Sequence, residues 1–481
     1  MSIFNNRYKF PAHMVTLLLI IAAMVITGVR LVVKTGPSSR SDTMALAMPD
    51  QVRSAAKNVA QVLVSMYADT QTGTILSGIP GLLKYPPYYW WEAGAMFGQL
   101  IDYWYYTGDT QWNDLIREGI VHQIGEGRNF MPANQSKDEG NDDQLFWAFT
   151  VMSAAEYNFP NPPDNVPGWL ALAQSIFNQL VDRWEPATCG GGVRWQIYQW
   201  LPGWNYKNLA SNGGFFQLGA RLALYTGNDT YAQKAVEIYD WLANTVPLIT
   251  PDYKVYDGTD VLKNCTDYDR NQWTYNYGIL IGGCAYMYNY TNGSQLWADR
   301  LNGFINQSNY FFPPGYESIM LDPCEISQAC NIDQVSFKGY LARWFAVAAQ
   351  LAPFTAPQIL PHLQRSGKAA AQTCVSSDGV AQPFKCGNRW YWQGYDGNGG
   401  VGQQLAALSV ISANLITVAA PPKNVHSGGE SQGDPGLGTG GYDELPVKEP
   451  PGATKGGRAG ASFLTILVVG GVMSGGWWLI H

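Results

Sequence analysis

A recurring helical pattern constrains the fold of this chain more than any other feature of its sequence. Residues 100–109, 218–228 and 285–293 each begin as an apolar run and end in Tyr-Thr-Gly or Tyr-Thr-Asn. Glycine and asparagine readily adopt the left-handed conformation that stops a helix. Because a second helical segment follows each stop, we expect a chain built from successive helical hairpins.

The two helices of a hairpin differ in their hydrophobic patterning. Residues 90–106 and 145–155 are apolar nearly all round, which is typical of helices buried on every side. Residues 233–242 place their apolar side chains mainly on one side, as an outer helix does. Further apolar helices at 335–351 and 400–418 bring the total close to six hairpins, and strand signals are sparse. We therefore expect an all-α fold, an (α/α)6 barrel of inner and outer helices with a cleft at one end.

Residues 1–49 have the charge order of a secretory segment. Arg7 and Lys9 precede an apolar run from Met14 to Val29, which matches a signal peptide or a signal anchor. The pattern leaves open whether this segment is cleaved. Residues 50–420 follow as the expected barrel domain.

The C-terminal part of the chain predicts a surface anchor. Residues 421–461 are rich in Gly and Pro without apolar periodicity, so we expect a flexible stalk. Residues 462–481 form an apolar tail that lacks the basic residues normally following a membrane span. Small residues, a polar spacer and such a tail are typical of a glycosylphosphatidylinositol (GPI) signal. We expect attachment at Gly452, on the outer face of the plasma membrane or in the cell wall.

Glycosylation sequons and cysteines predict the same compartment. Six sequons lie between the two terminal segments, at Asn134, Asn228, Asn264, Asn289, Asn292 and Asn306. Seven cysteines fit an oxidising environment with one thiol left over. The pairs we favour are Cys324 with Cys330, Cys374 with Cys386, and Cys189 with Cys265, which would leave Cys284 as a buried free thiol. Spacing alone leaves the connectivity open.

Composition narrows the classes of partner. The formal net charge of −7 argues against a polyanion such as nucleic acid. Charged residues make up 14% and aromatic residues 13% of the chain, which suits a carbohydrate-binding protein and equally a large core. The five histidines show no metal-binding spacing, and neither a P-loop nor a dinucleotide fingerprint is present. We expect no metal, no cofactor and a monomeric chain.

Two adjacent carboxylates, Asp142 and Asp143, precede the apolar helix that starts at Leu145. Acidic residues in a first helical turn are favoured by the helix dipole, so capping alone could explain them. The alternative is catalysis, in which one carboxylate is the nucleophile and the other is the acid of a glycosidase. Carboxyl groups about 5 Å apart would then indicate a retaining double displacement.

Several motifs together resemble glycoside hydrolase family 76. The run Asn141-Asp142-Asp143-Gln144 is similar to the active-site signature of that family. The resemblance continues in colinear blocks at 89–95, 189–196, 206–214, 273–278 and 392–395, and so spans about residues 54–418. Members of the family include endo-α-1,6-mannanases and related GPI-anchored proteins of fungal cell walls. Their fold is an (α/α)6 barrel, in agreement with the hairpin pattern.

The resemblance implies a role for particular residues. Asp142 would be the nucleophile and Asp143 the acid/base, acting on α-1,6-linked mannose of mannan or of a GPI glycan. The expected sugar-binding residues are Trp90, Trp91, Lys207, Asn208, Asn212, Trp273, Tyr275, Asn276 and Tyr395. The resemblance to wall-anchored members implies transfer of mannose to an acceptor, a β-glucan of the wall, while the sequence does not choose between transfer and hydrolysis.

Two other interpretations remain open from the sequence. The same barrel could bind mannan without cleaving it, as an adhesin or scaffold, although such a protein has no need of two adjacent acids. Another α/α-barrel enzyme, such as a lyase or an endoglucanase, would usually place its catalytic acids on separate loops.

Overall fold

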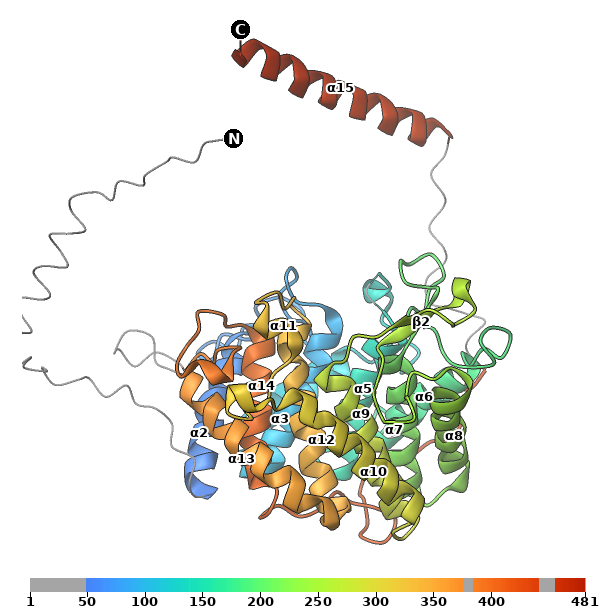
Figure 1. Cartoon of the computed structure of the whole chain (residues 1–481), viewed down its shortest axis with the longest axis vertical. Helices are drawn as coiled ribbons and strands as arrows, with labels where there is room; N and C mark the ends of the chain where they lie inside the picture. Colours follow the sequence, from blue (N-terminus) through green and yellow to red (C-terminus); the bar gives the residue numbers. More distant parts are fainter. Residues whose placement is uncertain (1–48, 138, 375–383, 441–454, 481) are drawn as a thin grey trace, which may run out of the picture. The chain divides into compact units, whose positions relative to one another are not determined.

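Six inner helices of the described part of the chain form a closed ring, which confirms the predicted (α/α)6 barrel. Figure 1 shows the helices of the barrel from the side. The computed structural model describes residues 49–137, 139–374, 384–440 and 455–480. Each inner helix contacts the next one along the chain, and the last contacts the first. The inner helices are α3 (Trp90–Thr107), α5 (Asn141–Glu156), α7 (Leu209–Thr226), α9 (Thr274–Tyr290), α12 (Phe337–Leu351) and α14 (Val401–Ser412).

Six outer helices pack against this ring: α2 (Pro49–Ser65), α4 (Asn113–His122), α6 (Trp169–Asp182), α8 (Asp229–Asp240), α10 (Gln295–Ser308) and α13 (Ala356–Thr373). The inner helices are buried along nearly their whole length, whereas outer helices such as α8 and α10 bury one side only; the outer helix α6 is more deeply buried. A short helix, α11 (Pro323–Ile326), lies in the loop before α12. Another helix, α15 (Lys455–Ile480), covers most of the C-terminal apolar tail. Among the described residues, no helix is both long enough and apolar enough to span a membrane.

The recurring Tyr-Thr-Gly motif ends helices as predicted. Gly108 after α3 and Gly227 after α7 have φ angles of 76° and 70°, the left-handed region that favours glycine. Their backbone N–H groups bond carbonyls of the preceding turn. The threonine has a function as well, because the hydroxyls of Thr107 and Thr226 each donate to the carbonyl four residues earlier, at 2.6 Å. The motif therefore satisfies carbonyls that a helix end would otherwise leave unpaired.

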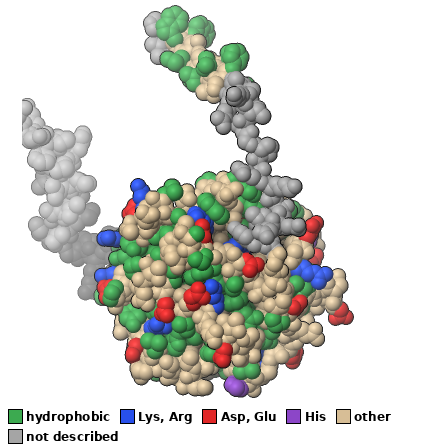
Figure 2. Space-filling view, turned by 90° about the vertical axis from the view of Figure 1, so that its right-hand side faces the viewer, with side chains coloured by type: hydrophobic (Ala, Val, Ile, Leu, Met, Phe, Trp, Pro, Cys, Tyr) green, Lys and Arg blue, Asp and Glu red, His purple; other side chains and the backbone are tan. Residues whose placement is uncertain are grey.

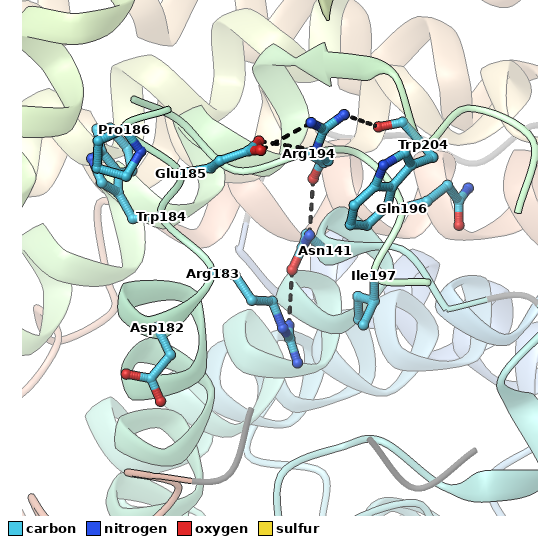
Figure 3. Close-up of a pocket in the computed structure, with 10 residues that line it drawn as sticks. All are labelled: Asn141, Asp182, Arg183, Trp184, Glu185, Pro186, Arg194, Gln196, Ile197 and Trp204. Atoms are coloured by element: carbon cyan, nitrogen blue, oxygen red, sulfur yellow. Dashed lines mark hydrogen bonds and ion pairs between the residues drawn. The ribbon is translucent and has the colours of Figure 1, made fainter. Parts of the chain in front are cut away.

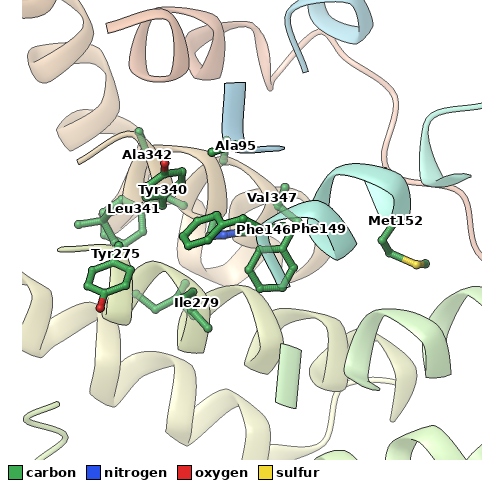
Figure 4. Close-up of a cluster of buried hydrophobic side chains, with 14 of the residues drawn as sticks. Ala95, Phe146, Phe149, Met152, Tyr275, Ile279, Tyr340, Leu341, Ala342 and Val347 are labelled. Carbon is green, nitrogen blue, oxygen red and sulfur yellow. The ribbon is translucent and has the colours of Figure 1, made fainter. Parts of the chain in front are cut away.

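Aromatic side chains from three inner helices fill the centre of the barrel (Figure 4). Phe146 of α5 lies 5.0 Å from Tyr340 of α12, ring centre to ring centre, and 6.0 Å from Phe149. All three rings are buried. On the face shown in Figure 2, acidic and basic side chains are scattered among uncharged ones, in keeping with the low fraction of charged residues.

Two buried ion pairs join the inner helices near the C-terminal end of α5. Arg221 of α7 binds Glu156 of α5 at 2.7 Å, and neither side chain is more than 1% exposed. Arg343 of α12 binds Asp102 of α3 at 2.7 Å. Ser153 of α5 accepts a hydrogen bond from both guanidinium groups. One polar network thus joins four inner helices.

A small antiparallel sheet is the main exception to the all-α architecture. Strand β1 (Tyr206–Asn208) pairs with β2 (Gly258–Asp260), and β2 pairs with β3 (Tyr268–Asp269). Strand β1 leads directly into α7. The sheet therefore fixes the loop from which α7 starts.

The disulfide pairing agrees with the pairing favoured from the sequence. Three bonds join Cys189 to Cys265, Cys324 to Cys330, and Cys374 to Cys386. Cys284 is free and buried in α9. Five sequon asparagines are exposed, and the sixth, Asn289, is half-buried with its amide on the carbonyl of Leu351.

Residues 421–440 differ from the flexible stalk expected there. The N–H of Lys423 donates to the carbonyl of Glu156 at 2.8 Å, and the N–H of Asp434 donates to the Gln174 side chain of α6 at 2.7 Å. The Asn178 amide, also of α6, donates to two backbone carbonyls of the same segment. A segment held through its own backbone needs no apolar periodicity, so composition alone could not reveal the docking. The expected domain boundary at residue 420 therefore lies too early, while the segment 14–29 and Gly452 lie outside the described residues.

Replacing Arg221 tests how much the buried ion pairs stabilise the barrel. We expect Arg221→Met to lower the free energy of unfolding by about 3–5 kcal/mol, because Glu156 would stay buried without its partner charge. Chemical denaturation followed by tryptophan fluorescence measures this change. Arg117→Met removes a largely exposed ion pair with Asp114 and should change the same quantity by less than about 0.5 kcal/mol. Equal effects of the two substitutions would contradict this role of the buried pair.

Candidate active site

A cavity of about 660 Å³ lies at the N-terminal ends of the inner helices. Trp91 of α3, Asp142 of α5, Tyr275 of α9 and Phe337 of α12 all stand within the first two residues or first turn of their helices, and Asn208 caps α7. The full lining comprises Tyr89, Trp91, Lys137, Asp142, Asp143, Phe146, Trp195, Gln196, Pro202, Tyr206, Asn208, Asp257, Asp269, Tyr275, Asp333 and Phe337. Because the positive ends of these helix dipoles meet at the cavity, it favours negative charge.

Asp142 and Asp143 stand in the first turn of α5, half-buried and facing the cavity. One oxygen of Asp142 accepts a 2.7 Å hydrogen bond from the Asn208 amide, and the other accepts from the backbone N–H of Asp143 at 3.0 Å. Asp143 accepts from the backbone N–H of Gly140 at 2.6 Å. Each carboxylate is thus fixed in position by at least one donor of the surrounding backbone or side chains.

Gly140 brings the two carboxylates close together. A Cβ atom added at this residue would lie 2.6 Å from Oδ1 of Asp142 and 2.7 Å from Oδ2 of Asp143. These two oxygens therefore lie at most about 5 Å apart, a limit that is compatible with the carboxylate separation of retaining glycosidases. The absence of a side chain at Gly140 leaves the space that both carboxylates occupy.

A third carboxylate, Asp257, faces the same cavity from the loop before β2. It accepts hydrogen bonds from the Tyr206 hydroxyl at 2.8 Å and from the Asn276 amide at 3.2 Å. Burial raises its pKa, and the neighbouring Asp269 raises it further while Tyr206 lowers it. The sequence analysis missed Asp257, because a lone acid in a loop carries no pattern that would mark it.

The environment of Asp142 raises the pKa of its carboxyl group to about 7. Burial is the main cause, and the negative charge of Asp257 acts in the same direction. Hydrogen bonds from Asn208 and from the backbone N–H of Asp143 lower it. The carboxyl group of Asp142 can therefore change its protonation state near neutral pH, unlike an ordinary aspartate.

Aromatic rings form the walls of the cavity. Trp91 lies 4.5 Å from Phe146, ring centre to ring centre, and its indole N–H donates to Asp333 at 3.1 Å. Tyr275 and Phe337 are stacked at 4.1 Å. Flat apolar walls with carboxylates between them suit sugar rings, whose C–H groups pack on aromatic faces while their hydroxyls need polar partners.

Arg183 connects the residues on both sides of the carboxylate pair. This buried side chain follows α6 and donates to Oδ1 of Asn141 at 2.8 Å (Figure 3). It also donates to Oε1 of Gln144 at 2.7 Å. Asn141 also donates to the carbonyl of Arg194 at 2.9 Å. In the Asn-Asp-Asp-Gln run, the outer residues are held by one guanidinium and the inner two face the cavity.

A second cavity of about 310 Å³ lies on the other side of the 194–197 segment (Figure 3). Its lining includes Arg183, Asn141 and an Arg194–Glu185 ion pair at 2.9 Å. Gln196 lines both cavities. The carboxylate pair does not line this second cavity, so we place the chemistry in the larger one.

The larger cavity contains five of the eleven residues that the sequence analysis assigned to the site: Asp142, Asp143, Trp91, Asn208 and Tyr275. The structure places the other six outside its lining. Asn276 lies outside the lining, and its side-chain amide donates a hydrogen bond to Asp257. Trp273 packs edge-on against Phe337, and Tyr395 is on an exposed loop.

The remaining three predicted residues are turned into the protein. The Trp90 indole donates to Gln123 at 3.0 Å, and the Asn212 side chain bonds the backbone of Val193. Lys207 is fully buried, and its ammonium group donates to the carbonyls of Thr188 and Gly191. Alternation along β1 explains why Lys207 points away while Asn208 leads into the cavity-facing cap of α7.

Comparison with known proteins identifies close relatives. Residues 51–426 match glycosyl hydrolase family 76. The chain is 41% identical to mannan endo-1,6-alpha-mannosidase DCW1 of Saccharomyces cerevisiae, over 90% of this chain and 93% of that protein. It is 39% identical to mannan endo-1,6-alpha-mannosidase DFG5 of the same yeast, over 86% and 89% of the two chains.

Comparison with solved structures also finds similar proteins. The crystal structure of Dfg5 from Chaetomium thermophilum in complex with glucosamine superimposes with a TM-score of 0.77 at 40% identity, covering 83% of this chain and 98% of that one. An inactive variant of the α-1,6-mannanase of Salegentibacter sp., in complex with α-1,6-mannotetrose, has a TM-score of 0.59 at 17% identity, over 76% and 98% of the chains. The latter similarity concerns the fold alone.

Arg183→Met tests the clamp on the Asn-Asp-Asp-Gln run. We expect amide hydrogen exchange at residues 139–145 to rise at least tenfold, because Asn141 and Gln144 would lose the donor that holds them. Hydrogen-exchange mass spectrometry measures this change peptide by peptide. Exchange in α10, remote from the substitution, should stay as in the wild type. Unchanged exchange at 139–145 would show that Arg183 does not hold the start of α5.

Proposed function

The chain belongs to glycosyl hydrolase family 76, and we propose that it cleaves α-1,6-linked mannose by a retaining mechanism and transfers the mannosyl group to a sugar acceptor. The observation that carries this proposal is the adjacent pair Asp142 and Asp143, which face one aromatic cavity with two of their oxygens at most about 5 Å apart. Both yeast relatives bear the name of a mannan endo-1,6-alpha-mannosidase.

In the first step the Asp142 carboxylate attacks the anomeric carbon of the mannose. A bond forms between this carbon and the Asp142 oxygen while the bond to the leaving sugar oxygen breaks. Asp143 gives its proton to that oxygen, so the leaving sugar departs as a neutral alcohol. The product is a covalent mannosyl-enzyme and an ionised Asp143.

In the second step an acceptor hydroxyl attacks the same carbon from the side of the departed sugar. Asp143 takes the proton of the hydroxyl, and the carbon–oxygen bond to Asp142 breaks, which restores both carboxyl groups to their starting states. Water as acceptor gives hydrolysis, and a sugar hydroxyl gives transfer. We propose mannose of a GPI glycan as donor and β-glucan of a cell wall as acceptor.

Asn208 and Asp257 would act in opposite directions on the ionisation of the nucleophile. Asn208 stabilises the ionised form of Asp142 through its 2.7 Å hydrogen bond, whereas burial and Asp257 oppose ionisation. Formation of positive charge on the sugar in the transition state would be favoured by the nearby carboxylates Asp257 and Asp269.

We further propose that the chain enters the secretory pathway and is held at the cell surface by a GPI anchor at Gly452.

The main competing function is a mannan-binding protein without catalysis. The placement of the carboxylate pair argues against it, because two adjacent acids face the same aromatic cavity, as a retaining reaction requires. A binding protein would gain more from neutral hydrogen-bonding groups at these positions.

The proposal is tested with purified full-length protein and α-1,6-mannotetraose, with and without β-glucan oligosaccharides, and with products resolved by mass. We expect cleavage by the wild type, and at least a thousandfold lower rate for both Asp142→Asn and Asp143→Asn. Products that carry mannose on glucan would identify transfer. Binding without cleavage by the folded wild type would favour the mannan-binding alternative, and activity retained in both variants would remove the pair from the mechanism.

The pH dependence of the rate tests the role of Asn208. Asp142 must be ionised to attack, so kcat/KM should fall as the pH drops through about 7, the pKa of this carboxyl group in the free enzyme. Asn208→Asp keeps an oxygen to cap α7 but replaces the donor by a negative charge. The pKa of Asp142 should therefore rise, and the acidic limb of the profile should move upward by at least one pH unit. A limb that stays in place would show that Asn208 does not control the ionisation of Asp142.

A further inference from the structure

Exposed aromatic side chains continue from the larger cavity onto the surface of the barrel. Tyr89 lines the cavity and is 38% exposed, and Tyr85 is 64% exposed. Trp392, the last residue of the short helix η9 (Trp390–Trp392), is 55% exposed, and Tyr395 in the loop that follows is 37% exposed. We call these four residues the aromatic rim. The mechanism proposed above assigns no role to these four side chains.

The two loops that carry the aromatic rim adjoin each other. The Tyr88 hydroxyl, next to Tyr89, accepts a hydrogen bond from the N–H of Val401 at 3.2 Å. A Cβ atom added at Gly400 would lie 3.0 Å from the same hydroxyl, and one added at Gly399 would lie 2.7 Å from the Tyr395 hydroxyl. The loop that carries Trp392 and Tyr395 therefore adjoins the loop that forms the cavity mouth.

Trp392 is braced in a way that leaves one ring face free. The guanidinium of Arg389 lies 4.5 Å from the centre of the Trp392 ring, on one face. Arg389 is fixed in turn by Asp396, whose buried carboxylate accepts from its side chain at 2.9 Å and from its backbone N–H at 3.1 Å. An exposed indole costs free energy in water, yet this one is held open by a charged pair. Such rigid support is expected of a stacking platform and not of a surface residue without a function.

The geometry of the platform discriminates between classes of sugar. In a β-linked glucose ring the hydroxyl groups and the linkage oxygen are all equatorial, so each face presents only C–H groups to an aromatic plane. An α-linked mannose ring carries an axial oxygen on each face, at C1 on one side and at C2 on the other. A single flat indole face therefore packs better on β-glucosyl than on α-mannosyl units.

We propose that the aromatic rim, centred on Trp392, binds a β-glucan chain and leads it toward the cavity. The inference rests on the proposed function in one respect, since this chain would be the acceptor of the mannosyl group. An acceptor bound beside the mouth would raise the local concentration of sugar hydroxyls over that of water at the second step. Trp392 would then be a specificity-determining residue of transfer, outside the machinery that cleaves mannose.

Binding is measured by calorimetry with full-length protein, using a linear β-1,3-glucan hexasaccharide and, separately, α-1,6-mannohexaose. We expect the wild type to bind the glucan, Trp392→Ala to bind it roughly tenfold more weakly, and Trp392→Phe to stay within about threefold of the wild type. Tyr310→Ala removes an equally exposed ring on the outer surface, 54% exposed, and should leave glucan binding unchanged. Asp396→Asn should weaken binding less than Trp392→Ala, because it loosens the brace and keeps the ring.

A parallel assay separates this inference from the proposed function. Trp392→Ala should cleave α-1,6-mannotetraose as the wild type does while the yield of mannosylated glucan falls at least fivefold. Glucan binding equal in Trp392→Ala and wild type, or no glucan binding by the wild type, would overturn the inference. An increase of KM for mannan in Trp392→Ala as large as the loss of glucan affinity would also overturn it, since the rim would then serve the donor. A wild type that binds glucan through Trp392 but cleaves no mannan would instead contradict the proposed function alone.

Discussion

The buried ion pairs between the inner helices are the constraint on which the cavity depends. Arg221 with Glu156 and Arg343 with Asp102 join four of the six inner helices, and Ser153 connects the two pairs. A buried charge left without its partner is costly, so these helices are not free to slide along one another. Glu156 and Asp142 are the two ends of α5, about 20 Å apart. The ion pairs thereby fix the relative position of the inner helices along their axes at one end of the barrel. This position determines which residues meet in the cavity at the other end.

The sequence predicted those parts of the structure that local chemistry determines. Tyr-Thr-Gly motifs marked the ends of α3 and α7, and the all-round apolar runs marked the buried inner helices. The adjacent acids at 142 and 143 could be recognised because they break an apolar pattern at a helix start. Asp257 could not be found this way, since its place in the site depends on how the loop before β2 folds over the barrel. Lys207 and Asn212 were polar residues in a suitable segment, yet the direction of each side chain follows from β1 and α7 packing, which sequence patterns do not encode.

The Asn-Asp-Asp-Gln run divides two tasks between inner and outer residues. Asn141 and Gln144 are buried and hold the helix start through Arg183, while Asp142 and Asp143 are half-buried and face the cavity, where we propose that they act. Helix capping and the proposed catalysis are compatible in this arrangement, because Asp143 accepts from the N–H of Gly140 and still faces the cavity. The N-terminal ends of five inner helices lie around the cavity. The positive ends of their dipoles stabilise the negative charge of several neighbouring carboxylates.

The docked segment 421–440 shortens the tether between the barrel and the expected anchor. Gly440 and Gly452 are 12 residues apart, and such a piece of chain spans at most about 40 Å. An enzyme attached at Gly452 would therefore search only a thin layer above the membrane. Glycans carried by neighbouring lipid-anchored molecules would lie in the same layer and so within its reach. Weak intrinsic affinity for each glycan would then suffice, and turnover would be governed by lateral diffusion in the membrane rather than by encounter from solution.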